Sequence, residues 1–248
     1  MILSEPSPTS YDVNFRVFGV PVRIHPLFWL VSLIWAGRNP PSVAVVFVIA
    51  ILISITIHEL GHVLAFRYFG VRSYVVLHAF GGLAIPSGQY GFGRARMTPA
   101  ARAIIAFAGP AVQILSAYLL FALVKLAGVR AGFPPEGIFR FIPFADIESR
   151  YLYYFVNYYF IISIFWALIN LLPIIPLDGG RIAQVLFESA DPRTGTRQAL
   201  ILSMIMSGLV AALMLVQFRD WFSAVFFVYL GAMNYQTFNS LDYRGDRW

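Results

Sequence analysis

The sequence predicts an all-α polytopic membrane protein with about six transmembrane helices and a small membrane-associated β segment. Hydrophobic residues make up 59% of the 248 residues and charged residues only 12%, whereas soluble domains carry about 25% charged residues. The mean hydropathy is +0.72. Because a span takes about 20 residues, about six spans leave little room for anything else. We therefore expect a single integral membrane domain over residues 1–248, with no appended soluble domain.

The distribution of charge argues against a nucleic-acid-binding protein, and the absence of cysteine excludes a thiolate metal site. The formal net charge is +6, but the arginines are scattered between apolar runs and form no basic stripe of the kind that binds nucleic acid. There are no cysteines, so neither disulfides nor thiolate ligands are available, and a metal could be held only by His, Asp or Glu. Residues 1–11 lack the basic region and apolar core of a signal peptide.

The N-terminal part predicts a short strand or interfacial arm and then a weak first span. Apolar and polar residues alternate before Gly19, as in a half-exposed strand. The apolar run 27–37 is short for a span unless it includes residues 20–24, with Arg23 reaching the interface. His25 precedes a proline, and we expect it to be interfacial and not a metal ligand.

Residues 43–66 predict a clear span, and residues 71–85 predict a hairpin or small sheet near the membrane surface. The second segment is rich in β-branched and aromatic residues and contains Gly81-Gly82. His78 lies in it. No metal-ligand spacing links His78 to the other histidines, so a structural or surface role is expected.

Two further core spans are expected at about 103–126 and 151–180, with a polar loop between them. The first is interrupted by Gly109-Pro110, and Gln113 follows one turn later. In the second, tyrosines resembling an interfacial belt open a helix over residues 151–172. The remainder of this span is irregular, because two prolines stop the helix.

The last third of the chain predicts a short amphipathic helix and two more spans. We expect Asp178 on extended backbone before a turn at Gly179-Gly180, and then a helix over 181–188. Residues 189–197 are expected to form an exposed loop. Spans are expected at 199–217 and 221–233, followed by a polar tail over 234–248.

A His-Glu-x-x-His segment inside the span 43–66 carries the main chemical signal. His58 and His62 are four residues apart, so they share one helix face and can reach one metal ion. Glu59 lies beside them, and a carboxylate next to a zinc-bound water is the arrangement of a hydrolase. The alternative is a helix whose two histidines are hydrogen-bonded to neighbouring helices.

Counting spans brings Asp178 to the same side of the membrane as the histidines. The chain crosses twice between His62 and Asp178. His58 lies about 22 Å along its helix, which leaves it about 8 Å below the far surface of a 30 Å core. If the tyrosine belt lies at the interface, the next helix runs about 20 Å and Asp178 reaches a similar depth. Two histidines, one aspartate and a water make a catalytic zinc shell.

Basic residues predict the orientation. With six spans and an internal N-terminus, 12 arginines lie inside and 6 basic residues lie outside, which favours a cytoplasmic N-terminus. The metal site would then open towards the cytosol.

These residues together resemble the site-2 protease family of intramembrane zinc metalloproteases. The resemblance rests on residues 58–62, on 170–180, and on Gly19-Val-Pro-Val-Arg-Ile-His-Pro, which is similar to the N-terminal stretch of compact bacterial and archaeal members. It implies cleavage of transmembrane segments of other membrane proteins, a place in signalling, and a prokaryotic inner membrane location. Lipid and transmembrane substrates are the expected partners; the sequence does not give the oligomeric state.

Carried over by residue, the resemblance implies that His58, His62 and Asp178 ligate Zn²⁺ and that Glu59 is the general base. Asn170 would lie near the scissile carbonyl; its alternative role is a helix C-terminal cap. The chain departs from the family at Gln113, where members often have Asn, and at Ile175, where they often have proline. Neither position is one of the expected zinc ligands. There is no room for the PDZ or CBS domain of many members, so substrate selection would use the membrane part or another protein.

Two other function classes compete with proteolysis. A membrane metal transporter or metal-binding protein could use the same ligands, but transport needs polar residues along a continuous path, and the spans offer few beyond Gln113 and Asn157. A catalytically silent relative is disfavoured by the complete set of His, Glu, His and Asp.

Overall fold

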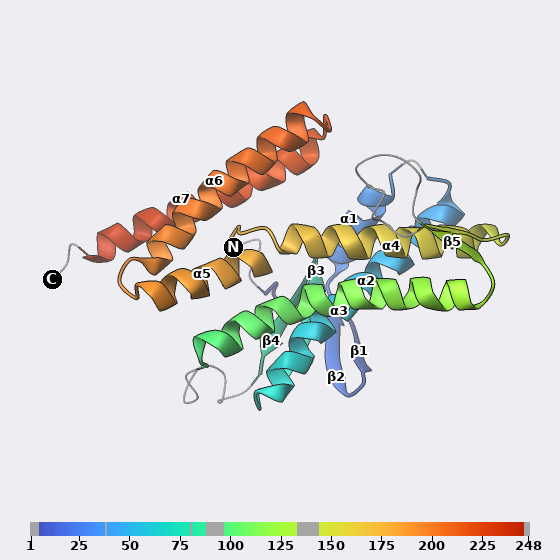
Figure 1. Cartoon of the computed structure of the whole chain (residues 1–248), viewed down its shortest axis with the longest axis horizontal. Helices are drawn as coiled ribbons and strands as arrows, with labels where there is room; N and C mark the ends of the chain where they lie inside the picture. The colour runs from blue at the N-terminus through green and yellow to red at the C-terminus, as the bar shows by residue number, and fades with distance from the viewer. Residues whose placement is uncertain (1–4, 38, 80, 88–96, 133–143, 246–248) are drawn as a thin grey trace. The chain divides into compact units, whose positions relative to one another are not determined.

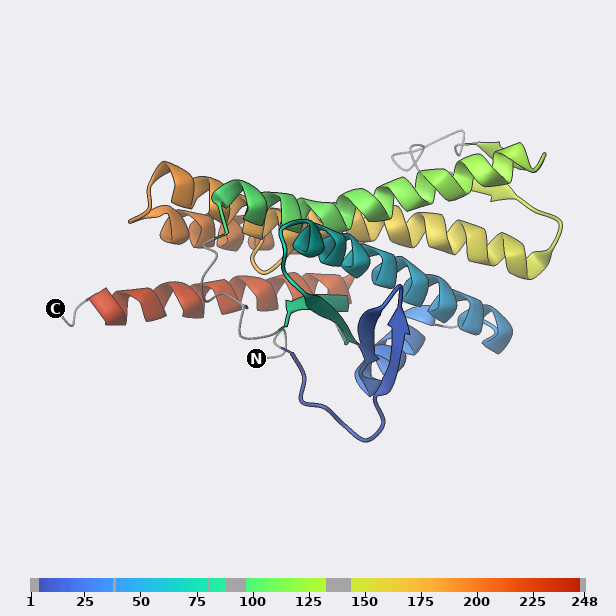
Figure 2. The ribbon, with the colours of Figure 1, turned by 90° about the horizontal axis from the view of Figure 1, so that it is seen from below.

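The computed structural model describes residues 5–37, 39–79, 81–87, 97–132 and 144–245 (Figures 1 and 2). The chain divides into two compact units. Unit 1 comprises residues 1–96 and 108–168, and unit 2 comprises residues 97–107 and 169–248. The described part is mainly helical with small sheets, as predicted.

Unit 1 contains a four-stranded sheet in the order β1-β2-β3-β4. Its strands are β1 (Val13–Val17), β2 (Val20–Ile24), β3 (Ser73–His78) and β4 (Gly81–Pro86). β1 and β2 form one antiparallel hairpin and β3 and β4 another, while β2 pairs with β3 in parallel. The predicted N-terminal strand and the predicted hairpin over residues 71–85 are both confirmed.

Two helices connect β2 to β3. Helix α1 (Pro26–Ala36) is capped by His25, whose Nδ1 accepts a hydrogen bond from the Leu27 amide at 3.2 Å. Helix α2 (Pro41–Tyr68) contains the His-Glu-x-x-His segment. A buried apolar cluster that includes Ile24, Ile55 and Leu77 joins the sheet to both helices. The histidine helix is therefore anchored on the sheet.

Helices α3 (Pro99–Leu126) and α4 (Arg150–Asn170) lie where the next two spans are predicted, at about 103–126 and 151–180, and α4 ends at Asn170. Pro110 lies inside α3 without ending it. Within unit 1, a second apolar cluster packs α2, α3 and α4 together around Phe160. The expected loop after α3 includes two short paired strands, β5 (Arg130–Gly132) and β6 (Phe144–Asp146). Asn157 of α4 accepts from the Ala145 amide and donates to the Ala145 carbonyl, which attaches β6 to that helix.

Unit 2 contains α5 (Asp178–Ala190), α6 (Gly195–Val216) and α7 (Trp221–Gly245), and α6 and α7 form a long antiparallel pair (Figure 1). Three local predictions are wrong here. Asp178 is the first residue of α5, and the extended residue is Leu177. The expected loop 189–197 is shorter, because α6 starts at Gly195. The expected polar tail from residue 234 continues α7 to Gly245.

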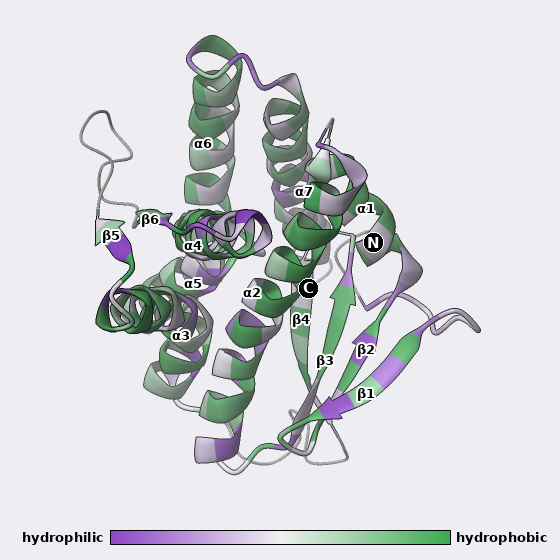
Figure 3. Ribbon diagram, turned by 90° about the vertical axis from the view of Figure 1, so that its right-hand side faces the viewer, coloured by the Kyte–Doolittle hydropathy of each residue, from purple (hydrophilic) through white to green (hydrophobic). Residues whose placement is uncertain are grey.

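Within the part of the chain that the structure describes, four helices are long and apolar enough to span a membrane: α2, α3, α4 and α6. Figure 3 shows that their residues are mostly hydrophobic, whereas hydrophilic residues interrupt β1. Several apolar helices of this length make the chain a multi-pass integral membrane protein. Helix α1 is shorter than a span, and α7 turns polar in its second half. Of the basic residues in the orientation count, Arg38, Arg94, Arg96, Arg140 and Arg247 lie outside the described residues.

Candidate metal centre

The two histidines of α2 lie together on one face of the helix and are buried. His58 is 2% exposed and His62 8%, and their Nε2 atoms are 3.1 Å apart. Glu59, between them in sequence, is 4% exposed. Three buried ionisable side chains in a candidate span are costly unless they are paired or hold a metal.

Helix α3 approaches these histidines closely because both helices have glycine at the contact. A Cβ atom on Gly61 would lie 2.6 Å from the carbonyl oxygen of Ala108, and one on Gly109 would overlap Nε2 of His62 and lie 2.9 Å from Nε2 of His58. A side chain at residue 109 would therefore fill the space in front of both nitrogen atoms. The glycine keeps that space open for a ligand of the imidazoles.

Gln113 fixes the orientation of His58 from the same face of α3. Its Oε1 lies 2.9 Å from His58 Nδ1, and its Nε2 donates to Ser54 Oγ at 2.9 Å. Ser54 Oγ in turn lies 2.8 Å from Ser163 Oγ. Because an amide oxygen only accepts, Nδ1 carries the proton and Nε2 keeps its lone pair for a metal. Gln113 is fully buried, and its side chain is engaged by these two contacts.

In unit 2, the segment before Asp178 is held by α6 and α7. The Ile175 amide donates to Ser203 Oγ at 3.0 Å, and Asn234 Nδ2 donates to the Ile175 carbonyl at 2.7 Å. Helix α5 then starts at Asp178, whose side chain is buried. The backbone before the carboxylate is thus fixed by polar contacts on both sides of residue 175.

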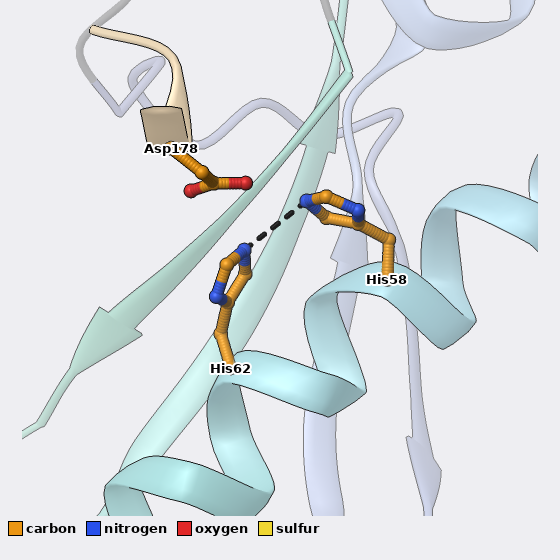
Figure 4. A group of neighbouring side chains, drawn as sticks. All are labelled: His58, His62 and Asp178. Carbon is orange, nitrogen blue, oxygen red and sulfur yellow. Dashed lines mark hydrogen bonds between the residues drawn. The ribbon is translucent and has the colours of Figure 1, made fainter. Parts of the chain in front are cut away.

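His58, His62 and Asp178 form a possible metal site (Figure 4). Each side chain offers one ligand atom, and these atoms all lie within 4.8 Å of one another. Two imidazole nitrogens and one carboxylate oxygen are the donor set of a catalytic zinc site, which leaves a position for water. The residues present therefore fit Zn²⁺.

Glu59 lies against the sheet. A Cβ atom on Gly82 of β4 would overlap the Glu59 side chain, so the carboxylate packs directly on the strand backbone. This contact was not predicted from the sequence. Asn170 is the last residue of α4 and is half-buried, so the helix ends two residues before the expected end at residue 172.

The other two histidines have structural positions. His25 caps α1, as described above. His78 is buried at the end of β3, and burial, with the nearby charges of His25 and Arg23, lowers its pKa to about 4. Among the described residues, the possible metal group includes neither of them.

Sequence reasoning missed the contact of Gln113 with His58, although one signal for it was present. Gly109 and Gln113 are four residues apart, so they lie on one face of α3. The glycine marks that face as the one in close contact with α2. The polar residue one turn later therefore points to the same helix.

Comparison with known proteins gives consistent matches. Peptidase family M50 matches residues 46–215. Rip3 from Mycobacterium tuberculosis is 32% identical over 68% of this chain and 42% of its own length. Zinc metalloprotease MJ0392 from Methanocaldococcus jannaschii is 24% identical over 87% of this chain and 60% of its own length. The chain thus spans about half the length of the curated relatives that it matches.

The fold also matches a solved structure. The site-2 protease from Methanocaldococcus jannaschii aligns with 92% of this chain and 95% of its own, with a TM-score of 0.58 and 18% sequence identity. This similarity concerns the fold, while the family model covers the sequence on both sides of the histidines and Asp178. From that match, the protein belongs to peptidase family M50, the site-2 protease family.

Proposed function

We propose that the protein is an intramembrane zinc metalloendopeptidase that hydrolyses peptide bonds within or near transmembrane segments of other membrane proteins. The observation that carries the proposal is the buried group of His58, His62 and Asp178, with Glu59 next to the first histidine on α2. We also propose that residues 1–248 act as one integral membrane metalloprotease domain.

The chain supplies three zinc ligands, one base and one candidate hydrogen-bond donor. When bound, zinc would act as a Lewis acid and lower the pKa of a bound water to about 7. Glu59 accepts the proton of the attacking water on a carboxylate oxygen and returns it to the departing amine. Gln113 keeps Nδ1 of His58 protonated throughout, so that Nε2 remains a ligand. Asn170 would donate to the developing oxyanion, a contact worth about 2.7–4 kcal/mol.

A substrate helix must open locally before it is cut, because its carbonyls are occupied by its own hydrogen bonds. The β3–β4 hairpin offers a place for the opened stretch. β4 is at the edge of the four-stranded sheet and lies against Glu59 through Gly82. A substrate strand added to the edge of β4 that is unpaired among the described residues would therefore pass close to the base.

Proline substitutions can test this strand addition. Prolines on alternate residues of β4 remove backbone donors from the edge and should lower cleavage without loss of zinc. The matched control places prolines in the same way on β1, which is the opposite edge of the same sheet. Unchanged cleavage with the β4 variants, or equal losses with both sets, would rule out substrate pairing at β4.

We propose six membrane crossings with the N-terminus and the opening of the site in the cytoplasm of a prokaryotic cell. The first crossing would be made by α1, since β2 is held in the sheet by β1 and β3. The 11 residues of α1 reach about 17 Å, so the bilayer would be thinned around this helix. Helix α7 would supply the sixth crossing with its apolar first half.

Metal transport is less well supported by the polar contacts. Gln113 is bonded to His58 and Ser54, and Asn157 is bonded to the Ala145 backbone. Both side chains therefore hold the structure together and do not line a path for an ion. The remaining polar residues of the candidate spans are mainly small hydroxyl groups.

The decisive experiment compares wild type with Glu59→Gln in two assays: the zinc content of the purified protein and the cleavage of a model transmembrane substrate. One equivalent of zinc in both proteins, with cleavage only by the wild type, is the expected result. Cleavage by Glu59→Gln at the wild-type rate would refute the role of the base. Zinc-dependent ion flux in proteoliposomes that survives the substitution would favour transport.

A further inference from the structure

We propose that a cavity between the sheet and the end of α2 binds a phosphate-bearing anion. The cavity has a volume of about 590 Å³, within the range of small-molecule sites. Its lining includes three arginines, Arg16 from β1, Arg67 from the last turn of α2 and Arg72 from the loop before β3. It lies in unit 1 and uses none of the residues of the metal centre.

The three arginines have charge available for a ligand. Among the described residues, the ion pairs involve Arg23 and Arg102, and Arg16, Arg67 and Arg72 take part in none of them. Arg23, on the neighbouring strand, shows the contrast, since Glu5 and Asp12 contact it at 2.7 and 2.9 Å. The acidic groups near the sheet are thus already engaged, and the cavity keeps a net positive charge.

A hydroxyl group of the lining adds a hydrogen-bond donor. Ser87 lines the same cavity and is partly exposed, so its hydroxyl can reach a ligand there. A phosphate oxygen would accept from it, and the arginines beside it would balance the charge of such a ligand. Ser73 also lines the cavity, but its Oγ is buried away from it.

The position of the cavity favours a ligand at the membrane surface. Arg67 is in the last turn of a candidate span, and the exposed aromatic residues Phe18 and Tyr68 flank the cavity in sequence. Basic side chains at the end of a span meet lipid headgroups. The chemistry that the cavity recognises is a phosphate monoester or diester, from either a lipid headgroup or free phosphate.

Titration of the detergent-solubilised full chain with three probes tests the proposal: short-chain phosphatidic acid, inorganic phosphate, and short-chain diacylglycerol, which lacks phosphate. Saturable binding of a phosphate probe is expected, and diacylglycerol should not compete with it. Tighter binding of phosphatidic acid identifies a headgroup site, and equal binding of inorganic phosphate identifies a free-phosphate site; either supports the proposal. Equal binding of diacylglycerol would overturn it.

Variants test whether the anion binds in this cavity or responds only to the overall charge of the surface. Ser87→Ala removes one donor to a charged group and should weaken phosphate binding about tenfold. The triple variant Arg16→Gln, Arg67→Gln, Arg72→Gln should weaken it about 100-fold, at about 1 kcal/mol for each arginine. The matched control removes three exposed basic residues elsewhere: Lys125→Gln, Arg130→Gln and Arg193→Gln. Its affinity should stay within about twofold of wild type.

Two results would contradict the assignment. Equal losses in the two triple variants would mean that the anion responds only to net charge. Wild-type affinity in Ser87→Ala would mean that this hydroxyl does not contact the anion. Zinc content, measured on every variant, reports that the chain is still folded, because the metal centre lies elsewhere.

Discussion

Replacing Gln113 with leucine should weaken zinc binding by about 10- to 100-fold, the usual loss when the outer partner of a metal-binding histidine is removed. Leucine fills a similar volume but cannot accept the proton of His58 Nδ1, a contact of 2.9 Å in the wild type. The imidazole would then lose the bond that fixes its tautomer and ring orientation. The affinity loss corresponds to about 1.4–2.7 kcal/mol.

The same substitution should also lower the stability of the fold. It removes the amide oxygen that accepts from the ring N–H of His58, while the hydroxyl of Ser54 keeps its bond to Ser163. One unsatisfied buried group costs about 1–3 kcal/mol. Gln113→Glu keeps an acceptor for His58, so it should retain zinc affinity better than Gln113→Leu even though it loses the donor to Ser54.

The assay is competition with a zinc chelator on the detergent-solubilised protein, together with its unfolding midpoint. The matched control is Asn157→Leu, which removes a buried amide of unit 1 that bonds Ala145 and lies outside the metal group. This variant should lose stability but keep zinc affinity. Gln113→Leu with wild-type zinc affinity, or an equal affinity loss in Asn157→Leu, would refute the positioning role of Gln113.

Three further predictions concern the site and the sheet. Gly109→Ala should abolish zinc binding, because its methyl group would occupy the space in front of both imidazoles, whereas Gly208→Ala, with open space around it, should have no effect on zinc content. Gly82→Ala should displace Glu59 and reduce cleavage by at least tenfold with zinc retained; a rate within twofold of wild type would contradict this contact. The lowered pKa of His78, about 4, means that the unfolded chain binds a proton more readily. Stability should therefore fall by about 1.4 kcal/mol per pH unit as the pH drops from about 6.5 towards 4, and the fall should be smaller in His78→Gln.

The elements with strong local signals could be predicted from the sequence. The span containing His58 and Glu59 is bounded by prolines on one side and Gly70 on the other, and its apolar run admits no other structure. The hairpin over 71–85 combines β-branched residues with a glycine pair. In both cases, local preference and burial favour the same structure.

The start of α5 could not be predicted because its glycines serve packing and not a turn. A Cβ atom on Gly179 would overlap the backbone of Leu171, and one on Gly180 would overlap the backbone of Ile174. Such contacts depend on how the chain folds back after α4. The local sequence shows only that glycine permits a turn. It therefore predicted Asp178 on extended backbone, whereas Asp178 is the first residue of α5.

The end of α7 shows a second limit. Residues 234–248 are polar, and polarity indicates exposure to water, not the end of a helix. Asn234 marks the change: it is buried, and its side chain donates to the Ile175 carbonyl. That bond joins residues 59 positions apart, so the local sequence pattern does not predict it.

The parallel pairing of β2 with β3 links the assembly of the sheet to membrane insertion. The two strands are separated in sequence by α1 and α2, so Ile24 can pair with Leu77 only after α2 has been synthesised and inserted. If α2 entered the bilayer in the wrong orientation, β3 would emerge on the side opposite β2 and the sheet could not form. β4 joins the sheet through β3, and Gly82 brings it against Glu59. The carboxylate therefore acquires its neighbour only in chains whose histidine helix is correctly oriented, which would keep misinserted chains inactive.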